Sequence, residues 1–91
     1  MVELAPNVKD DALKRLRRIE GQARGVQRMI EENRDCHEIL HQLTAIRAAA
    51  YQTSLLVARN FAAECLRNPD GTRSAEAMVD ELLQVLGKMP D

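Results

Sequence analysis

Apolar residues recur every three or four positions over the first third of the chain, which is the spacing of one face of an α-helix. This pattern predicts a helix over residues 7–32, preceded by a short loose arm of residues 1–6. Asn7 and Asp10 have the spacing of a capping box, so we expect them to start the helix. The narrow apolar stripe consists of Ala12, Leu16, Ile19, Ala23, Val26 and Ile30.

A second and longer apolar stripe predicts a helix over residues 35–67, a segment that contains no proline or glycine. Asp35 and Glu38 again have capping-box spacing and mark its start. The residues of the stripe are Ile39, Leu43, Ile46, Ala50, Val57 and Phe61.

Two cysteines, Cys36 and Cys65, stand at the two ends of this second helix. On one straight helix they lie within about 20° of the same face but about 44 Å apart along the axis. They therefore cannot meet within one chain, whereas an antiparallel partner would bring Cys36 of one chain beside Cys65 of the other. The spacing predicts a dimer with two equivalent inter-chain thiol sites. Cys36 falls in the first helical turn, where backbone N–H groups favour the reactive thiolate form.

The last segment predicts a third helix over residues 74–88, after a turn at residues 68–71 and with Ser74 as its cap. The chain has 91 residues, no Trp, one Phe and one Tyr, so its core must consist of aliphatic residues and Met. We therefore expect a single all-α domain of residues 1–91, with three helices. A chain this short buries only about 60–65% of its unfolded surface, which favours an oligomer. Together with the cysteine spacing, this predicts an antiparallel helical-bundle dimer. The apolar face of the third helix comprises Met78, Val79, Leu82, Leu83, Val85 and Leu86.

The net charge of −1 argues against nucleic-acid binding unless the basic residues share one face, and in the first helix they do. Five of them fall within an arc of about 120° opposite the apolar stripe, and Arg15 flanks it. Gly21 and Gly25 lie inside the arc, where their missing side chains would let a phosphate backbone approach. A solvated face is the alternative reading of the charges, and a packing role is the alternative for the glycines. The arc consists of Lys14, Arg17, Arg18, Arg24 and Arg28.

Several function classes lack support in the sequence. No segment resembles a signal peptide or a membrane span, so we expect a cytoplasmic protein with reduced cysteines. A C-x-x-C dithiol, a Gly-rich phosphate loop and an acid–base cluster are all missing, so we expect no enzyme. His37 and His41 are spaced as a helical pair but turn about 100° or more from Cys36, which favours ordinary surface histidines.

Residues 13–32, LKRLRRIEGQARGVQRMIEE, are followed by a cysteine that opens the next helix and by a Q-x-x-A-x-R-A-A segment from Gln42 to Ala49. This combination resembles the CsoR/RcnR family of small all-helical bacterial repressors. The resemblance implies a dimer built on antiparallel second helices, two dimers joined as a homotetramer, and operator DNA that is released when an inducer reaches the cysteine site. The residues that we expect to contact DNA are Lys14, Arg15, Arg17, Arg18, Gln22, Arg24, Arg28 and Arg47.

The inducer site of the family can be carried over residue by residue. Cys36 and Cys65 match its two cysteines, but Phe61 stands where copper, nickel and formaldehyde sensors have a histidine. Asp35 replaces the supporting Tyr of the copper branch, and Glu81 matches its supporting Glu. A phenyl ring has no lone pair, so the three-ligand copper site cannot form as such.

The resemblance leaves three functional readings. A cysteine pair without the histidine is similar to the branch that senses persulfides, so reactive sulfur or another thiol-directed oxidant is the favoured inducer. The first alternative is Cu(I), for which the metal ligands would be Cys36 and Cys65, because two thiolates suit this soft ion. The alternative from another class is a helical interaction module with structural cysteines.

Overall fold

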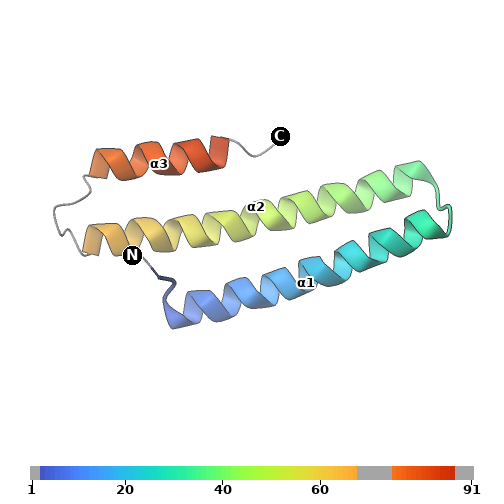
Figure 1. The fold of residues 1–91 in the computed structure, drawn as a ribbon, viewed down its shortest axis with the longest axis horizontal. Coiled ribbons are helices and arrows are strands. Elements are labelled where there is room, and N and C mark those ends of the chain that lie inside the picture. The colour runs from blue at the N-terminus through green and yellow to red at the C-terminus, as the bar shows by residue number, and fades with distance from the viewer. Residues whose placement is uncertain (1–2, 68–74, 88–91) are drawn as a thin grey trace.

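The computed structural model describes residues 3–67 and 75–87, and these residues form three helices and no strand. The helices are α1 (Pro6–Glu31), α2 (Cys36–Arg67) and α3 (Ala75–Gly87). Figure 1 shows α1 and α2 as an antiparallel pair, with α3 beside the C-terminal half of α2. The predicted all-α class is confirmed. The predicted turn at residues 68–71 and the Ser74 cap lie outside the described residues.

The start of α1 differs from the prediction. The helix begins at Pro6, and its N-cap is Ala5, which has no side chain capable of capping. Asn7 and Asp10 therefore lie inside the first turns and do not form the expected capping box. A proline suits the first helical position because its fixed φ is already helical and the N–H that it lacks would have no partner there. The Lys9 N–H donates to the Ala5 carbonyl oxygen at 2.8 Å and closes the first turn.

Residues 3–5 of the N-terminal arm are held in place, contrary to the expected loose segment. The Ala5 N–H donates to Oδ1 of Asn60 at 3.1 Å, and Nδ2 of Asn60 donates to the Glu3 carbonyl oxygen at 3.3 Å. The side chain of Asn60 is 8% exposed, and both ends of its amide are used by the arm. We call this pair of bonds the arm clamp. It fixes the start of α1 against the last third of α2.

The corner between α1 and α2 is built by backbone hydrogen bonds. The Arg34 N–H donates to the Met29 carbonyl oxygen at 2.9 Å, and the Asn33 N–H donates to the Ile30 carbonyl oxygen at 3.1 Å. Asn33 has φ of 56°, the left-handed conformation that this type of helix ending requires. Asn tolerates it better than most residues other than Gly. The Arg34 guanidinium donates to both carboxylate oxygens of Glu38 at 3.2 and 3.3 Å, which ties the corner to α2.

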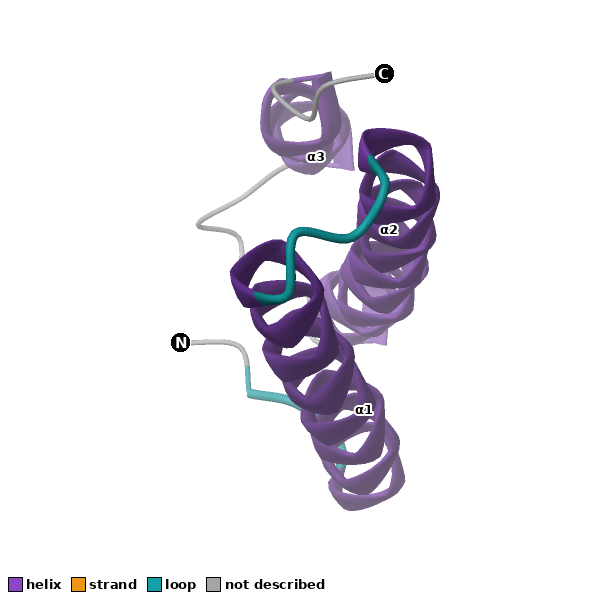
Figure 2. Cartoon of the chain, turned by 90° about the vertical axis from the view of Figure 1, so that its right-hand side faces the viewer, coloured by secondary structure: helices purple, strands orange, loops and turns teal. Residues whose placement is uncertain are grey.

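The three helices form a single row, with α2 between α1 and α3 (Figures 1 and 2). The chain measures 55 × 26 × 14 Å, and an α-helix with its side chains is about 10–12 Å across, so the row is one helix thick. Ala12 and Val26, each 5% exposed, are the buried apolar residues among those described. Large apolar side chains that belong in a core stay open to solvent, including Leu16 at 50%, Leu43 at 45% and Ile30 at 56%.

The second apolar stripe is therefore only partly covered by its own chain. Ile39 and Ile46 are half-buried, whereas Leu43 and Val57 are exposed. A layer without a second layer cannot build a core, so these side chains need another molecule. Among the described residues, no helix combines the length and apolar character that a membrane crossing requires.

Candidate functional site

The two cysteines lie on one uninterrupted helix, as the sequence predicts. Cys36 is the first residue of α2 and is exposed, whereas Cys65 lies in its last turn and is half-buried. Both thiols are free. A continuous helix keeps them about 44 Å apart, so a bond or a shared ligand between them requires two chains.

The other residues expected at the thiol site fall into two groups. Asp35 precedes Cys36, and its carbonyl oxygen accepts the first α2 hydrogen bond, from the Ile39 N–H at 3.2 Å. Phe61 stands one turn before Cys65, and Glu81 faces this end of α2 from α3. One chain therefore holds half of the predicted site at each end of α2. An antiparallel partner helix is the arrangement that would bring the two halves together.

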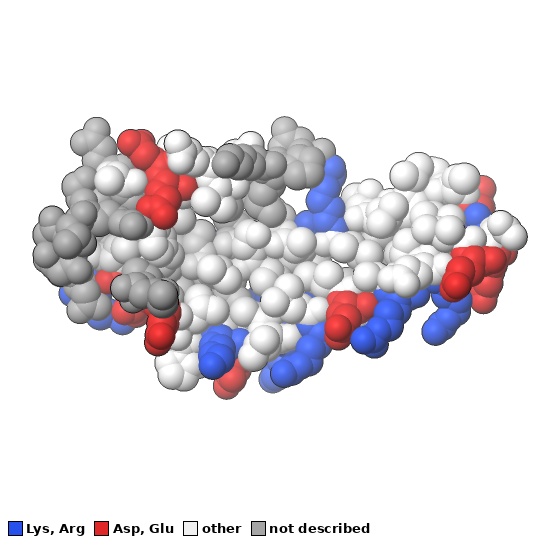
Figure 3. Space-filling view, viewed as in Figure 1, with Lys and Arg blue, Asp and Glu red and all other residues white. Residues whose placement is uncertain are grey.

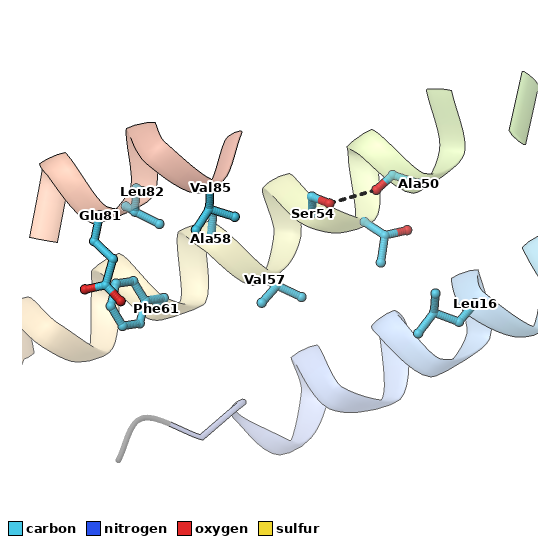
Figure 4. Close-up of a pocket in the computed structure, with 10 residues that line it drawn as sticks. Leu16, Ala50, Ser54, Val57, Ala58, Phe61, Glu81, Leu82 and Val85 are labelled. Carbon is cyan, nitrogen blue, oxygen red and sulfur yellow. Dashed lines mark hydrogen bonds between the residues drawn. The ribbon is translucent and has the colours of Figure 1, made fainter. Parts of the chain in front are cut away.

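An open groove of about 490 Å³ runs between α1, α2 and α3 and includes two of the expected site residues, Phe61 and Glu81. Figure 4 shows the Glu81 side chain reaching from α3 toward the phenyl ring of Phe61. The remaining lining is almost entirely apolar, apart from two hydroxyl groups. It comprises Leu16, Ala50, Thr53, Ser54, Val57, Ala58, Leu82 and Val85.

Sequence reasoning missed the groove because it treated each apolar stripe separately. The apolar face of the third helix was recognised, but its pairing with the Phe61 turn was not. Figure 4 places Leu82 and Val85 above α2, on the side of the groove opposite Leu16. The signal for the groove in the sequence was the apolar spacing of α3, because this apolar face lies against the end of α2 that carries Cys65.

The donor set of the chain limits which metal it suits. Within the described part of the chain, no three or more His, Cys, Asp or Glu residues are grouped to hold a metal ion. A tetrahedral zinc site needs four ligands, whereas two thiolates satisfy Cu(I) in linear coordination. His37 and His41 are exposed and lie on a side of α2 turned more than about 90° from Ala50 and Val57 in the groove. The thiols of two chains therefore fit Cu(I) better than Zn²⁺.

The expected basic face follows the outer edge of α1. Figure 3 shows Lys and Arg side chains along the lower edge of the molecule, with acidic side chains between them. Two of these arginines are engaged in ion pairs along the helix, Arg15 with Asp11 at 3.0 Å and Arg24 with Glu20 at 3.6 Å. Such exposed pairs are weak and exchange readily for a phosphate. The exposed basic residues of this face are Lys14, Arg15, Arg17, Arg18, Arg24 and Arg28.

Gln22 and Arg47, also expected to contact DNA, are placed differently. Gln22 is half-buried, and its Oε1 atom is buried without a hydrogen-bond partner. Arg47 is exposed on α2, a different helix from the other expected contacts. Gly21 and Gly25 have open space above them, because a Cβ atom added to either would meet nothing within 4 Å. Packing within one chain therefore does not explain why glycine occupies these two positions.

The model of the family described as "Metal-sensitive transcriptional repressor" matches residues 8–88. The chain belongs to this family. Members of the family bind operator DNA and form oligomers, so the repressor is a DNA-binding protein and not an enzyme. The predicted resemblance to CsoR and its relatives is thereby confirmed.

Two curated proteins are similar to the repressor over much of their length. The copper-sensing transcriptional repressor CsoR of Bacillus subtilis is 39% identical over 80 residues, which cover 88% of this chain and 79% of that protein. The copper-sensing transcriptional repressor RicR of Mycobacterium tuberculosis is 41% identical over 58 residues, covering 64% of this chain and 60% of that one.

Two solved structures have the same fold as the repressor. The copper-sensing repressor CsoR with Cu(I) from Geobacillus thermodenitrificans aligns with a TM-score of 0.75 and 36% identity, over 97% of this chain and 92% of that chain. The nickel-responsive transcriptional regulator InrS aligns with a TM-score of 0.69 and 33% identity, over 89% and 91%. Three of these four proteins are described as copper-sensing.

Proposed function

We propose that the protein is a cytoplasmic homotetrameric repressor that leaves operator DNA when an inducer joins Cys36 of one chain to Cys65 of the partner subunit. The observation that carries this proposal is the position of two free thiols at opposite ends of α2, beside an apolar stripe that its own chain covers only in part. Two copies of α2 packed antiparallel would cover the stripe and create two such sites. The basic edge of α1 would supply the contacts to DNA phosphates.

Cu(I) is the first candidate inducer. The copper-sensing relatives support it, and two thiolates are ligands that this ion accepts. Binding would release the proton of each thiol, because a coordinating cysteine must be deprotonated. Phe61 contributes no third ligand, so we expect the ion to be held by two sulfur atoms.

Reactive sulfur is the second candidate, and Phe61 is the specific observation in its favour. The Cys36 thiolate would attack the outer sulfur of an organic persulfide, RSSH, forming Cys36–S–SH and releasing the thiolate of RSH. The thiol of Cys65 of the partner subunit would then attack the inner sulfur and expel hydrosulfide. The two cysteine thiols become a disulfide, while the persulfide is reduced to RSH and H₂S.

A complementation experiment tests the inter-chain site. Cys36→Ala and Cys65→Ala chains, each of which lacks a complete site, are unfolded together and refolded as a mixture. Each mixed antiparallel dimer regains one intact pair, with the two cysteines on different chains. We expect release from operator DNA, followed by fluorescence anisotropy, to be absent in either variant alone and partly restored in the mixture.

The inducer is identified in the same samples by mass spectrometry under native and denaturing conditions. Exposure to Cu(I) should add one copper per intact thiol pair, whereas exposure to a polysulfide should crosslink a Cys36→Ala chain to a Cys65→Ala chain. Whichever treatment also releases DNA is the functional one. A mixture that stays as inert as the single variants would contradict the antiparallel inter-chain site.

A further inference from the structure

The arm clamp connects two parts of the chain that the proposed function requires to communicate. Asn60 bridges Ala5 and Glu3, which are 55 and 57 residues away in the sequence. Ala5 is the N-cap of α1, the helix that carries the basic face. Asn60 immediately precedes Phe61, which lines the groove one turn before Cys65. Asn60 thus contacts the start of α1 from the end of α2 that carries Cys65.

Asn60 and Phe61 face different neighbours because consecutive helical residues point about 100° apart. The Phe61 side chain turns into the groove toward Glu81, whereas Asn60 turns toward the arm and is nearly fully buried. A movement of this turn caused by a ligand at Cys65 would therefore also displace Ala5. A buried amide with both of its ends bonded transmits such a displacement because losing either bond would leave a polar group unsatisfied.

The middle of α2 contains a place where the helix can bend. The Thr53 hydroxyl donates to the Ala49 carbonyl oxygen at 2.9 Å, and the Ser54 hydroxyl donates to the Ala50 carbonyl oxygen at 3.1 Å. Hydroxyl bonds to the carbonyl four residues earlier compete with the helical bonds and often bend helices. Two consecutive ones separate the half of α2 that begins with Cys36 from the half that carries Asn60 and Cys65.

We propose that Asn60 is a positioning residue that couples the thiol site to the basic face of α1 through the arm clamp. This inference rests on the proposed function and names the route by which its inducer acts. When an inducer pulls Cys65 toward Cys36 of the partner subunit, the α2 segment after Ser54 tilts and moves Asn60. The arm clamp then shifts the start of α1, and the basic residues further along this helix, from Lys14 to Arg18, lose their register with the phosphates.

The test compares Asn60→Ala, which removes both bonds, with Asn60→Asp, which can still accept from Ala5 but cannot donate to Glu3. Gln52→Ala, an exposed amide of the same helix, is the matched control. Operator affinity is measured with and without Cu(I), and separately with and without a polysulfide. We expect Asn60→Ala to bind DNA within about threefold of the wild type but to lose about tenfold in the response to the inducer, a typical size for coupling between sites.

Removing residues 1–4 should reproduce the Asn60→Ala result, because it deletes the Glu3 carbonyl that the clamp uses. The truncation and Asn60→Ala combined should be no worse than either alone, as expected for two changes that break one connection. An unchanged inducer response in Asn60→Ala would overturn the proposal. An equal loss of DNA affinity with and without inducer would also overturn the proposal, because a clamp with only a structural role predicts that result.

An NMR measurement separates this proposal from the proposed function. The Ala5 amide signal reports on the arm clamp whether or not the protein releases DNA. Reaction of the thiol pair with Cu(I) or the polysulfide should shift this signal in the wild type and in Gln52→Ala. If the signal shifts while DNA stays bound, the proposed function fails and the coupling stands. If DNA is released without a shift at Ala5, the coupling fails and the proposed function stands.

Discussion

The Glu81 side chain on α3 points toward the phenyl ring of Phe61 on α2, and both residues line the groove (Figure 4). A phenyl ring offers no N–H for this carboxylate to accept. The geometry would suit an imidazole better, because a metal-binding histidine usually donates its second ring N–H to a carboxylate. The pair therefore predicts how the site would respond to a change at position 61.

Phe61→His should strengthen Cu(I) binding by at least about tenfold, because it adds a nitrogen ligand beside two thiolates and places its second nitrogen near Glu81. Competition with a chelator specific for Cu(I) measures the effect. Phe61→Leu is the matched control, since it changes the shape of the side chain without adding a donor.

Glu81→Gln should remove a large part of this gain in the Phe61→His background and have little effect on copper affinity beside the native Phe61. Loss of a carboxylate that supports a metal-bound histidine typically lowers metal affinity or activity by about 10- to 100-fold. If the native protein already binds Cu(I) as tightly as Phe61→His, an unrecognised ligand completes the site and the two-sulfur description is wrong.

Leu43→Asp should leave no stable folded dimer. Leu43 is 45% exposed in the single chain and belongs to the stripe that we expect to pack against the partner, where an unpaired charge is costly. Sedimentation and circular dichroism report on assembly and folding together. His41→Asp introduces the same charge on a different side of α2 and should remain assembled. A folded Leu43→Asp monomer would show that the stripe is not the interface.

Arg18→Ala should weaken binding to all DNA sequences without changing the fold. Arg18 is exposed and takes part in neither of the ion pairs of Arg15 and Arg24, so its removal should change stability by less than about 0.5 kcal/mol. The logarithm of the DNA affinity should fall with the logarithm of the salt concentration by about 0.9 per phosphate neutralised.

Arg67→Ala is the control for this change, because Arg67 pairs with Glu64 at 2.7 Å at the far end of α2. It should leave both the affinity and the salt slope as they are. A salt slope that is the same in the wild type, Arg18→Ala and the Arg17→Ala/Arg18→Ala double variant would exclude this edge of α1 from the DNA interface.

Gly21→Ala should stabilise the protein and weaken its DNA binding. Alanine in a helix interior is favoured over glycine by about 1 kcal/mol, and its added Cβ meets nothing within 4 Å. A phosphate that approaches the backbone at this position would lose that space. Thermal unfolding and operator affinity should therefore move in opposite directions, with Tm rising by several degrees. Gln27→Ala, an exposed change elsewhere on α1, should leave operator affinity unchanged.

The helices of this chain could be predicted from its sequence because they depend on local spacing. The spacing of apolar residues, three or four apart, predicted each end of α1 and α2 to within one residue. The error at the start of α1 came from giving the side chains of Asn7 and Asp10 more weight than Pro6. A proline at the first helical position starts a helix through its backbone, without a capping side chain.

The arm clamp could not be predicted, because Asn60 and Ala5 are far apart in the sequence and a single amide has no pattern. The position of Cys36 and Cys65 was predictable, since both belong to one helix whose geometry is regular. Their environment was not, because the groove at Phe61 requires three helices, and the second half of each proposed thiol site would belong to another molecule. Helical periodicity describes one element at a time and cannot specify such contacts.

A chain that is one helix thick has a consequence for the amount of protein that a cell must keep. Since the exposed parts of the apolar faces would be covered only in the assembly, the folded state should gain about 1.4 kcal/mol for each tenfold rise in protein concentration. Newly made chains would remain open to proteases until they find a second copy. We therefore expect the abundance of the repressor to have a lower threshold, below which chains are degraded faster than they assemble and the operator is left vacant without any inducer.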